Sequence, residues 1–285
     1  MRSMRHYLSL IKFSHTVFAL PFALIGFFLA LQTLDGPFPW TDLLLVLGCM
    51  VFARSAAMAF NRYLDSDIDA LNARTAVREI PKGVISRPQA LIFVILNSIA
   101  FIVCAGLLNE LCLYLSPVAL LVILGYSYTK RFTWLCHFVL GLGLSLAPVG
   151  AWLALTGQFA WLPIVFGLIV LTWVSGFDIL YALQDETFDR EHHLHSVPEW
   201  LGRRKALSLS IIVHVLTAAL VIVAGQIADG GTWYWIGAGF FTAMLIYQHM
   251  LVKPDDISRV NLAFATTNGM ASVAFGILVI ADILF

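Results

Sequence analysis

Two short acidic segments of the chain carry carboxylates at the same spacing. In NRYLDSDIDALNART the pair is Asp65 and Asp69, and in YALQDETFD it is Asp185 and Asp189. If the helix before each segment continues through it, both carboxylates of a pair lie on one face, with Cβ atoms about 5–6 Å apart. Hard oxygen ligands of this kind suit Mg²⁺, which takes the rest of its shell from water and phosphate. The spacing therefore predicts that all four aspartates are catalytic Mg²⁺ ligands.

Polar residues upstream extend both acidic pairs into the apolar runs. At about 100° per residue, Arg54 and Asn61 fall on the stripe of Asp65, and Asp178 and Tyr181 share a face with the second pair. Arg54 and Asp178 are expected inside the hydrocarbon zone, where ionisable groups normally face a cavity or a partner. The alternative is a structural link between helices, in its simplest form a direct Arg54–Asp178 pair.

Basic residues near the acidic segments are candidates for binding phosphate. Arg74 and Arg78 follow the first pair, and Lys130 and Arg131 end a later apolar run. Guanidinium groups bind phosphate oxygens in bidentate fashion. The alternative reading is ordinary positive charge in cytoplasmic loops.

The composition indicates an integral membrane protein. The 285 residues are 60% hydrophobic and 12% charged, with a mean hydropathy of +0.87, whereas soluble domains carry about 25% charged residues. The formal net charge of zero gives no indication of nucleic-acid binding, so the expected surroundings are membrane lipid. Apolar runs of about 20 residues must be helices in lipid. Nine such spans are predicted, at residues 14–34, 41–61, 89–108, 111–128, 135–155, 161–183, 206–228, 233–252 and 262–285.

The basic residues predict the orientation. All Lys and Arg except Arg54 lie in the N-terminal segment or in alternate loops. The positive-inside rule therefore places the N-terminus in the cytoplasm and the C-terminus outside. Both acidic segments then face the cytoplasm, beside spans two and six. We expect one all-α polytopic domain, 1–285, made of two related four-helix halves plus a ninth helix, and a substrate that joins a diphosphate to a lipid tail.

The chain resembles the UbiA superfamily of intramembrane prenyltransferases. In its first motif, N-D-x-x-D-x-x-x-D, Asn61, Asp65 and Asp69 match while Arg62 replaces an Asp. In its second motif, a D-x-x-x-D preceded by tyrosine, Tyr181 and both following aspartates match. The stretches KFSHTVFALPFALIG, RTAVREIPKG, YSYTKRFTWLCHFVLGLGLSLAPVGAWLA and GFDILYALQDETFDRE are similar to the bacterial 4-hydroxybenzoate polyprenyltransferase branch. Within it they are most similar to members thought to prenylate 1,4-dihydroxy-6-naphthoate on the futalosine route to menaquinone.

The resemblance implies Mg²⁺-dependent transfer of a polyprenyl group from its diphosphate to a carboxylated hydroxyaromatic ring, in ubiquinone or menaquinone biosynthesis, at a bacterial inner membrane. Residues expected to contact the diphosphate are Asn61, Arg74, Lys130 and Arg78. Arg54 or Arg131 is expected to bind the acceptor's carboxylate, and Tyr181 and Asp178 are expected to orient the acceptor or take its proton.

Two alternative functions remain open at this stage. One is another UbiA-type product (haem O, a chlorophyll or an archaeal lipid), and another is a secondary transporter, since intramembrane charges occur there too.

The segment EHHLH, with His192, His193 and His195, resembles a zinc site, but no carboxylate or Cys framework accompanies it, so we expect a solvated loop.

Overall fold

The computed structural model describes residues 7 and 10 and residues 18–285, and regular structure in this part of the chain is helical. It divides into two compact units. The first predicted span, 14–34, begins outside the continuously described part, as do the basic residues that precede it.

The first unit contains α3 (Trp40–Leu64), α4 (Ser66–Leu71), α5 (Arg87–Leu108) and α6 (Glu110–Thr129). The long helices α3 and α5 pack against each other. The start of α5 follows from its sequence, because Ser86 and Gln89 form a reciprocal capping box and a proline stands in the first turn. At the end that carries the first acidic segment, Ile80 and Ile85 of the connection pack with Ala59 and Ala90 of the two helices. The connection between α4 and α5 is thereby held against the helices.

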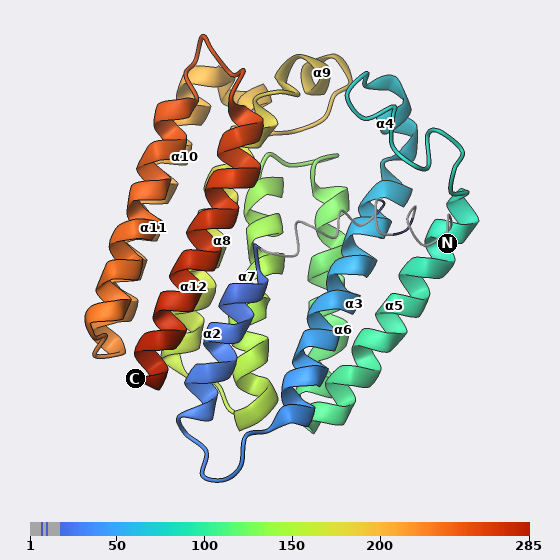
Figure 1. The fold of residues 1–285 in the computed structure, drawn as a ribbon. Coiled ribbons are helices and arrows are strands. Elements are labelled where there is room, and N and C mark those ends of the chain that lie inside the picture. The colour runs from blue at the N-terminus through green and yellow to red at the C-terminus, as the bar shows by residue number, and fades with distance from the viewer. Residues whose placement is uncertain (1–6, 8–9, 11–17) are drawn as a thin grey trace. The chain divides into compact units, whose positions relative to one another are not determined.

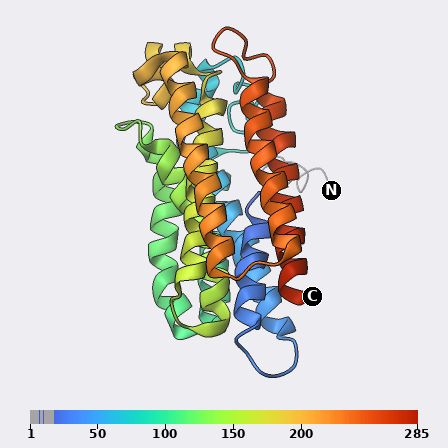
Figure 2. The same ribbon diagram turned by 90° about the vertical axis from the view of Figure 1, so that its left-hand side faces the viewer.

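The second unit contains α2 (Leu20–Leu31), α7 (Cys136–Thr156), α8 (Trp161–Ala182), α9 (Glu186–Glu191), α10 (Val197–Ile227), α11 (Thr232–Leu251), the π-helix η2 (Leu262–Thr267) and α12 (Asn268–Leu284). Helix α8 packs against both α7 and α10, and α11 packs against α12 (Figures 1 and 2). Of the candidate membrane spans, α8 has the largest share of residues buried inside the protein. The helix that leads into the second acidic segment is thus the central one of this unit.

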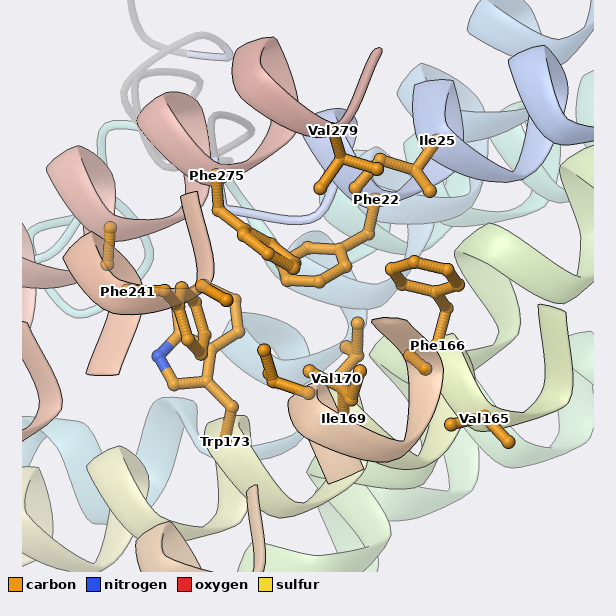
Figure 3. Close-up of a cluster of buried hydrophobic side chains, with 14 of the residues drawn as sticks. Phe22, Ile25, Val165, Phe166, Ile169, Val170, Trp173, Phe241, Phe275 and Val279 are labelled. Carbon is orange, nitrogen blue, oxygen red and sulfur yellow. The ribbon is translucent and has the colours of Figure 1, made fainter. Parts of the chain in front are cut away.

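Aromatic side chains from four helices meet around α8 (Figure 3). Trp173 of α8 lies 5.4 Å from Phe22 of α2 and 5.6 Å from Phe241 of α11, measured between ring centroids. Phe241 in turn lies 5.1 Å from Phe275 of α12. The indole N–H of Trp173 donates to the side-chain oxygen of Asn268 at 3.0 Å, which satisfies a polar group inside the core. These contacts hold α8 in a fixed rotation relative to α2, α11 and α12.

Each of the nine predicted spans contains a helix, but the boundaries differ at two of them. Helix α10 begins at Val197, nine residues before the predicted edge, and Gly202 interrupts it with φ 73° and ψ 164°, a left-handed conformation that glycine adopts without a Cβ penalty. The last predicted span begins as the π-helix η2. Neither interruption carries a hydropathy signal.

Within the described residues, seven helices are long and apolar enough to cross a membrane. These seven are α3, α5, α6, α7, α8, α10 and the η2–α12 segment. The chain is therefore an all-α polytopic integral membrane protein, and the count of nine crossings stays a prediction. The compact units do not coincide with the two expected four-helix halves, because α2 belongs to the second unit; the relation between the halves stays a prediction as well.

Candidate functional site

The first acidic segment does not continue α3 as a straight helix. Helix α3 ends at Leu64, Asp65 adopts φ −89° and ψ 4°, and the six-residue helix α4 follows. The main-chain N–H of Asp69 donates to the carbonyl oxygen of Asp65 at 2.7 Å. The expected spacing within one turn is therefore kept, although the long helix has been interrupted.

The second acidic segment has the same construction. Helix α8 ends at Ala182, Asp185 adopts φ −104° and ψ 2°, and the six-residue helix α9 follows. The N–H of Asp189 donates to the carbonyl oxygen of Asp185, again at 2.7 Å. In both segments the first aspartate has the sparsely populated backbone conformation in which active-site residues are often found.

In the first unit both carboxylates are buried and have polar partners. Asp65 and Asp69 are 1% and 4% exposed. The amide of Asn61 donates to Asp65 at 3.1 Å, and Nη1 of Arg78 lies 2.6 and 2.7 Å from the two oxygens of Asp69. Two predicted Mg²⁺ ligands and two predicted diphosphate contacts thus lie together. A cation on Asp69 would compete with Arg78 and release its guanidinium for an anion.

Two buried arginines of α3 have donor atoms without a partner among the described residues. These atoms are Nε of Arg54 and Nη1 of Arg62. Arg62, at the position where the family motif has an Asp, is 4% exposed and interacts electrostatically with Arg78 and Asp69. A buried guanidinium donor without an acceptor is costly. Both arginines therefore suit a bound anion, and for Arg62 this role was not predicted.

Other charged residues of this connection face away from the buried pair. Asp67 has a 78% exposed side chain and pairs with Arg87 at 3.0 Å. The guanidinium of Arg87 also lies over the ring of Tyr63, 5.1 Å from its centroid. Arg74 is exposed, and its backbone N–H donates to the side chain of Asn72. Asp67 is thus exposed and paired with a residue outside the set of candidate ligands.

In the second unit, Asp189 is held by a serine and lies in a partly enclosed environment. The hydroxyl of Ser196, just before α10, donates to Asp189 at 2.8 Å. Burial raises the pKa of the Asp189 carboxyl to about 6, and the neighbouring charge of Asp185 raises it further, whereas Ser196 and Lys130 act in the opposite direction. The carbonyl of Lys130 accepts the N–H of His195 at 2.7 Å, which ties the loop after α6 to the segment before α10. Lys130 therefore lies near the acidic pair, as predicted for a diphosphate contact.

The deeper polar residues of α8 have partners that the sequence did not indicate. Asp178 pairs with Nδ1 of His137, from the first turn of α7, at 2.7 Å. The sequence suggested Arg54 as an alternative partner, and the partner that the structure describes for Asp178 is a histidine from a neighbouring helix. Tyr181 lies 4.2 Å, ring centroid to ring centroid, from Phe264 in the π-helix. A lone histidine at the start of an apolar span was only a weak indication that His137 has a role. Its pairing with Asp178, 41 positions away, follows from the fold.

The acidic pairs have the chemistry of a Mg²⁺ site, while the histidine segment lacks that of a zinc site. Carboxylate oxygens are the donors that Mg²⁺ prefers, and burial raises the pKa of Asp189 because it disfavours the charged carboxylate, which a bound cation would stabilise. In the described part of the chain, no three His, Cys, Asp or Glu side chains already form a metal-binding group. His192, His193 and His195 are exposed in a turn, in agreement with the predicted loop.

Comparison with known proteins identifies the same family along nearly the whole chain. The UbiA prenyltransferase family matches residues 19–273. A 4-hydroxybenzoate octaprenyltransferase of Aliivibrio fischeri is 30% identical over 257 residues, 88% of this chain and 87% of the relative. A 4-hydroxybenzoate octaprenyltransferase of Vibrio cholerae is 31% identical over 235 residues, 80% of this chain and 81% of the relative.

Solved structures agree on the fold. A UbiA homologue from Aeropyrum pernix, determined in its apo form, has a TM-score of 0.81 at 32% identity, covering 95% of this chain and 97% of the other. A UbiA homologue from Archaeoglobus fulgidus, determined with DMAPP and Mg²⁺ bound, has a TM-score of 0.76 at 20% identity and covers 98% of this chain and 99% of the other.

Proposed function

The chain belongs to the UbiA prenyltransferase family, and from that premise we propose that it transfers a polyprenyl group from polyprenyl diphosphate to a carboxylated hydroxyaromatic ring. The prediction of an enzyme is confirmed by the family, which removes the transporter alternative. The relatives named 4-hydroxybenzoate octaprenyltransferases support a carboxylated phenol as acceptor. 4-Hydroxybenzoate and 1,4-dihydroxy-6-naphthoate both have that chemistry, and both serve quinone biosynthesis. A haem O, chlorophyll or archaeal lipid product is the remaining alternative.

The observation that supports this proposal most is the shared construction of the two acidic segments. In each, an aspartate outside regular helix follows the apolar helix, and a six-residue helix that carries a second aspartate begins directly after it. We assign Asp65, Asp69, Asp185 and Asp189 to hold Mg²⁺. When bound, Mg²⁺ supplies Lewis-acid neutralisation of the charge on the departing diphosphate.

The basic residues contribute the other part of leaving-group stabilisation. Arg78 becomes available when its ion pair with Asp69 opens, and Lys130 already lies near Asp189. Arg62 is a further donor, because its buried Nη1 has no partner among the described residues. Asn61 and Arg74 complete the predicted diphosphate contacts. Fixed positive groups of this kind stabilise charge where it develops.

The reaction requires little covalent chemistry from the protein. The allylic carbon–oxygen bond breaks, and its electron pair leaves with the diphosphate. The ring carbon beside the phenol oxygen donates a pair of π electrons to the allylic carbon, and the ring then loses the proton from that carbon. The closely packed rings of Tyr181 and Phe264 offer an aromatic surface for the allylic cation. Exclusion of water from this region prevents capture of the cation.

We further propose nine crossings of a bacterial cell membrane, with both acidic segments at the cytoplasmic surface. The distribution of Lys and Arg along the sequence supports this orientation. Arg54 or Arg131 would then bind the carboxylate of the acceptor. Arg54 is favoured because its buried Nε has no partner among the described residues and is therefore available to donate a hydrogen bond.

The test is transfer by the purified protein in nanodiscs. Geranyl diphosphate and a longer polyprenyl diphosphate are incubated with Mg²⁺ and each acceptor, with and without EDTA, beside an Asp65→Ala, Asp185→Ala double variant. We expect a prenylated ring from one acceptor, lost in the variant and with EDTA. No product from either acceptor with either donor would refute the proposed acceptor class, and haem and lipid-glycerol acceptors would be tested next.

A further inference from the structure

Asp178 and His137 form a hydrogen-bonded pair inside the second unit. The two residues come from the end of α8 and the start of α7, and His137 Nδ1 lies 2.7 Å from Asp178 Oδ2. The side chain of His137 is only 3% exposed, whereas that of Asp178 is 23% exposed. The carboxylate can therefore reach a ligand, and the imidazole cannot.

A second contact determines which imidazole nitrogen carries the proton. The backbone N–H of Val197, at the start of α10, donates to Nε2 of His137 at 3.2 Å. Nε2 must then present a lone pair, so the neutral imidazole carries its hydrogen on Nδ1 and donates it to Asp178. His137 is also fixed through its backbone, because Ser175 of α8 donates to its carbonyl oxygen at 3.3 Å. Three helices thus set the position and tautomer of one side chain.

Asp178 has one carboxylate oxygen available for a ligand. Its recorded bond within the described part of the chain uses Oδ2, which leaves Oδ1 for a ligand. Tyr181 lies three residues after Asp178 on α8 and therefore on the same face of the helix. Its ring packs against that of Phe264, 4.2 Å away between centroids, so the carboxylate of Asp178 has an aromatic neighbour on that face.

We propose that His137 is a positioning residue, which holds Asp178 so that its open oxygen accepts a hydrogen bond from the hydroxyl of the aromatic acceptor. The inference rests on the proposed function and adds a residue to it. A carboxylate that accepts from a phenol increases the electron density of the adjacent ring carbon, which is the carbon to be alkylated. Without the imidazole, Asp178 would be free to rotate and would lose the hydrogen bond that partly compensates its charge.

The experiment compares His137→Leu, His137→Gln and Asp178→Asn with the wild-type protein in nanodiscs, using geranyl diphosphate, Mg²⁺ and the acceptor that the wild type uses. KM is measured separately for donor and acceptor. We expect His137→Leu to raise the acceptor KM about tenfold or more and to lower kcat, because a charge-assisted hydrogen bond is lost. The donor KM should stay within about twofold, since the diphosphate contacts are unchanged.

His137→Gln provides the rescue. Its amide can donate to Asp178 and accept from Val197, so its acceptor KM should lie close to the wild-type value. The control His249→Gln alters a partly buried histidine of the same unit, whose partner is His214 at 2.8 Å. It should leave both KM values unchanged even where it lowers the thermal unfolding temperature.

Three outcomes would overturn the inference while leaving the proposed function intact. They are an unchanged acceptor KM in a folded His137→Leu protein, an equal rise of the donor and acceptor KM, and a His137→Gln protein as impaired as His137→Leu. A wild-type protein that prenylates no hydroxyaromatic acceptor would refute the proposed function, and this inference with it.

Discussion

Asp65 and Asp185 have the same backbone conformation in two separate helical segments, with φ −89°, ψ 4° and φ −104°, ψ 2°. Asp65 follows α3 directly and Asp185 follows α8 by three residues, and the carbonyl oxygen of each accepts the N–H of the aspartate four residues later at 2.7 Å. The interruption redirects the second carboxylate of each pair away from the axis of the long helix. Because both segments share this geometry and the chain belongs to a prenyltransferase family, their aspartates are the first targets for mutation.

Asp69→Asn should nearly abolish prenyl transfer. The substitution keeps the shape of the side chain and removes a charge that we assign to Mg²⁺, so we expect a loss of roughly 100-fold or more in kcat/KM. Asp67→Asn is the matched control, because Asp67 is exposed and pairs with Arg87 in the same segment. Its activity should stay within about twofold of wild type, since exposed ion pairs contribute little. Equal losses in the two variants would argue against a specific ligand role for Asp69.

The affinity for Mg²⁺ should decrease as the pH falls through about 6. Burial raises the pKa of Asp189 to about 6 in the absence of metal, and Mg²⁺ binds the deprotonated carboxylate, so protons compete with it below that pH. The half-saturating Mg²⁺ concentration, measured from pH 5 to 8, should rise by up to about tenfold per pH unit below 6. Ser196→Ala removes a hydrogen bond that lowers the pKa of Asp189. It should move the midpoint to higher pH, and a shift to lower pH would contradict the assignment.

Arg62→Met should weaken binding of the donor without unfolding the protein. Nη1 of Arg62 is buried and has no partner among the described residues, so an apolar side chain of similar length should be tolerated. If Arg62 binds the diphosphate, the donor KM should rise about tenfold or more, as expected for a hydrogen bond to a charged group. Arg87→Met serves as control, because the side chain of Arg87 is 45% exposed. An unchanged donor KM in Arg62→Met would assign Arg62 a purely structural role.

Phe264→Leu should lower kcat with little effect on either KM. The ring of Phe264 lies 4.2 Å from that of Tyr181, and cation–π stabilisation of about 0.5–2 kcal/mol corresponds to roughly 2- to 30-fold in rate. The control Phe159→Leu removes an exposed ring from the connection between α7 and α8. Single-turnover kinetics with saturating donor and acceptor would isolate the chemical step. A rate equal to wild type would exclude Phe264 from stabilising the cation.

Gly26→Ala should destabilise the second unit. A Cβ on Gly26 of α2 would collide with the backbone of Pro148 in α7, and neither backbone can move without separating the helices. We expect a loss of about 1–3 kcal/mol, as for other overpacked cores, seen as a lower thermal unfolding temperature in detergent. Gly150→Ala, in the same α7, is the matched control, because a Cβ there meets nothing within 4 Å. It should be neutral or stabilising, since alanine has the higher helix propensity.

The apolar spans and the acidic pairs could be predicted because their signals are local. Lipid leaves a backbone no hydrogen-bonding partner except its own helix, so a run such as 161–183 must be helical, and α8 covers nearly the same residues. The spacing of Asp185 and Asp189 likewise reports one turn of helix, and the hydrogen bond between their backbones confirms that turn. The break before each short helix was not predicted, because hydropathy carries no information about where a helix ends when the following residues are polar.

The partners of the polar side chains depend on packing that no periodicity reports. An all-α membrane protein with two carboxylate pairs could be predicted, since composition, span length and i, i+4 spacing are properties of contiguous segments. The fold was needed to show that Asp178 pairs with His137, that Asp69 pairs with Arg78, and that Tyr181 packs against Phe264. These contacts join residues 41, 9 and 83 positions apart, and their geometry follows from how neighbouring helices are rotated and how connecting segments fold back, which a one-dimensional pattern does not encode.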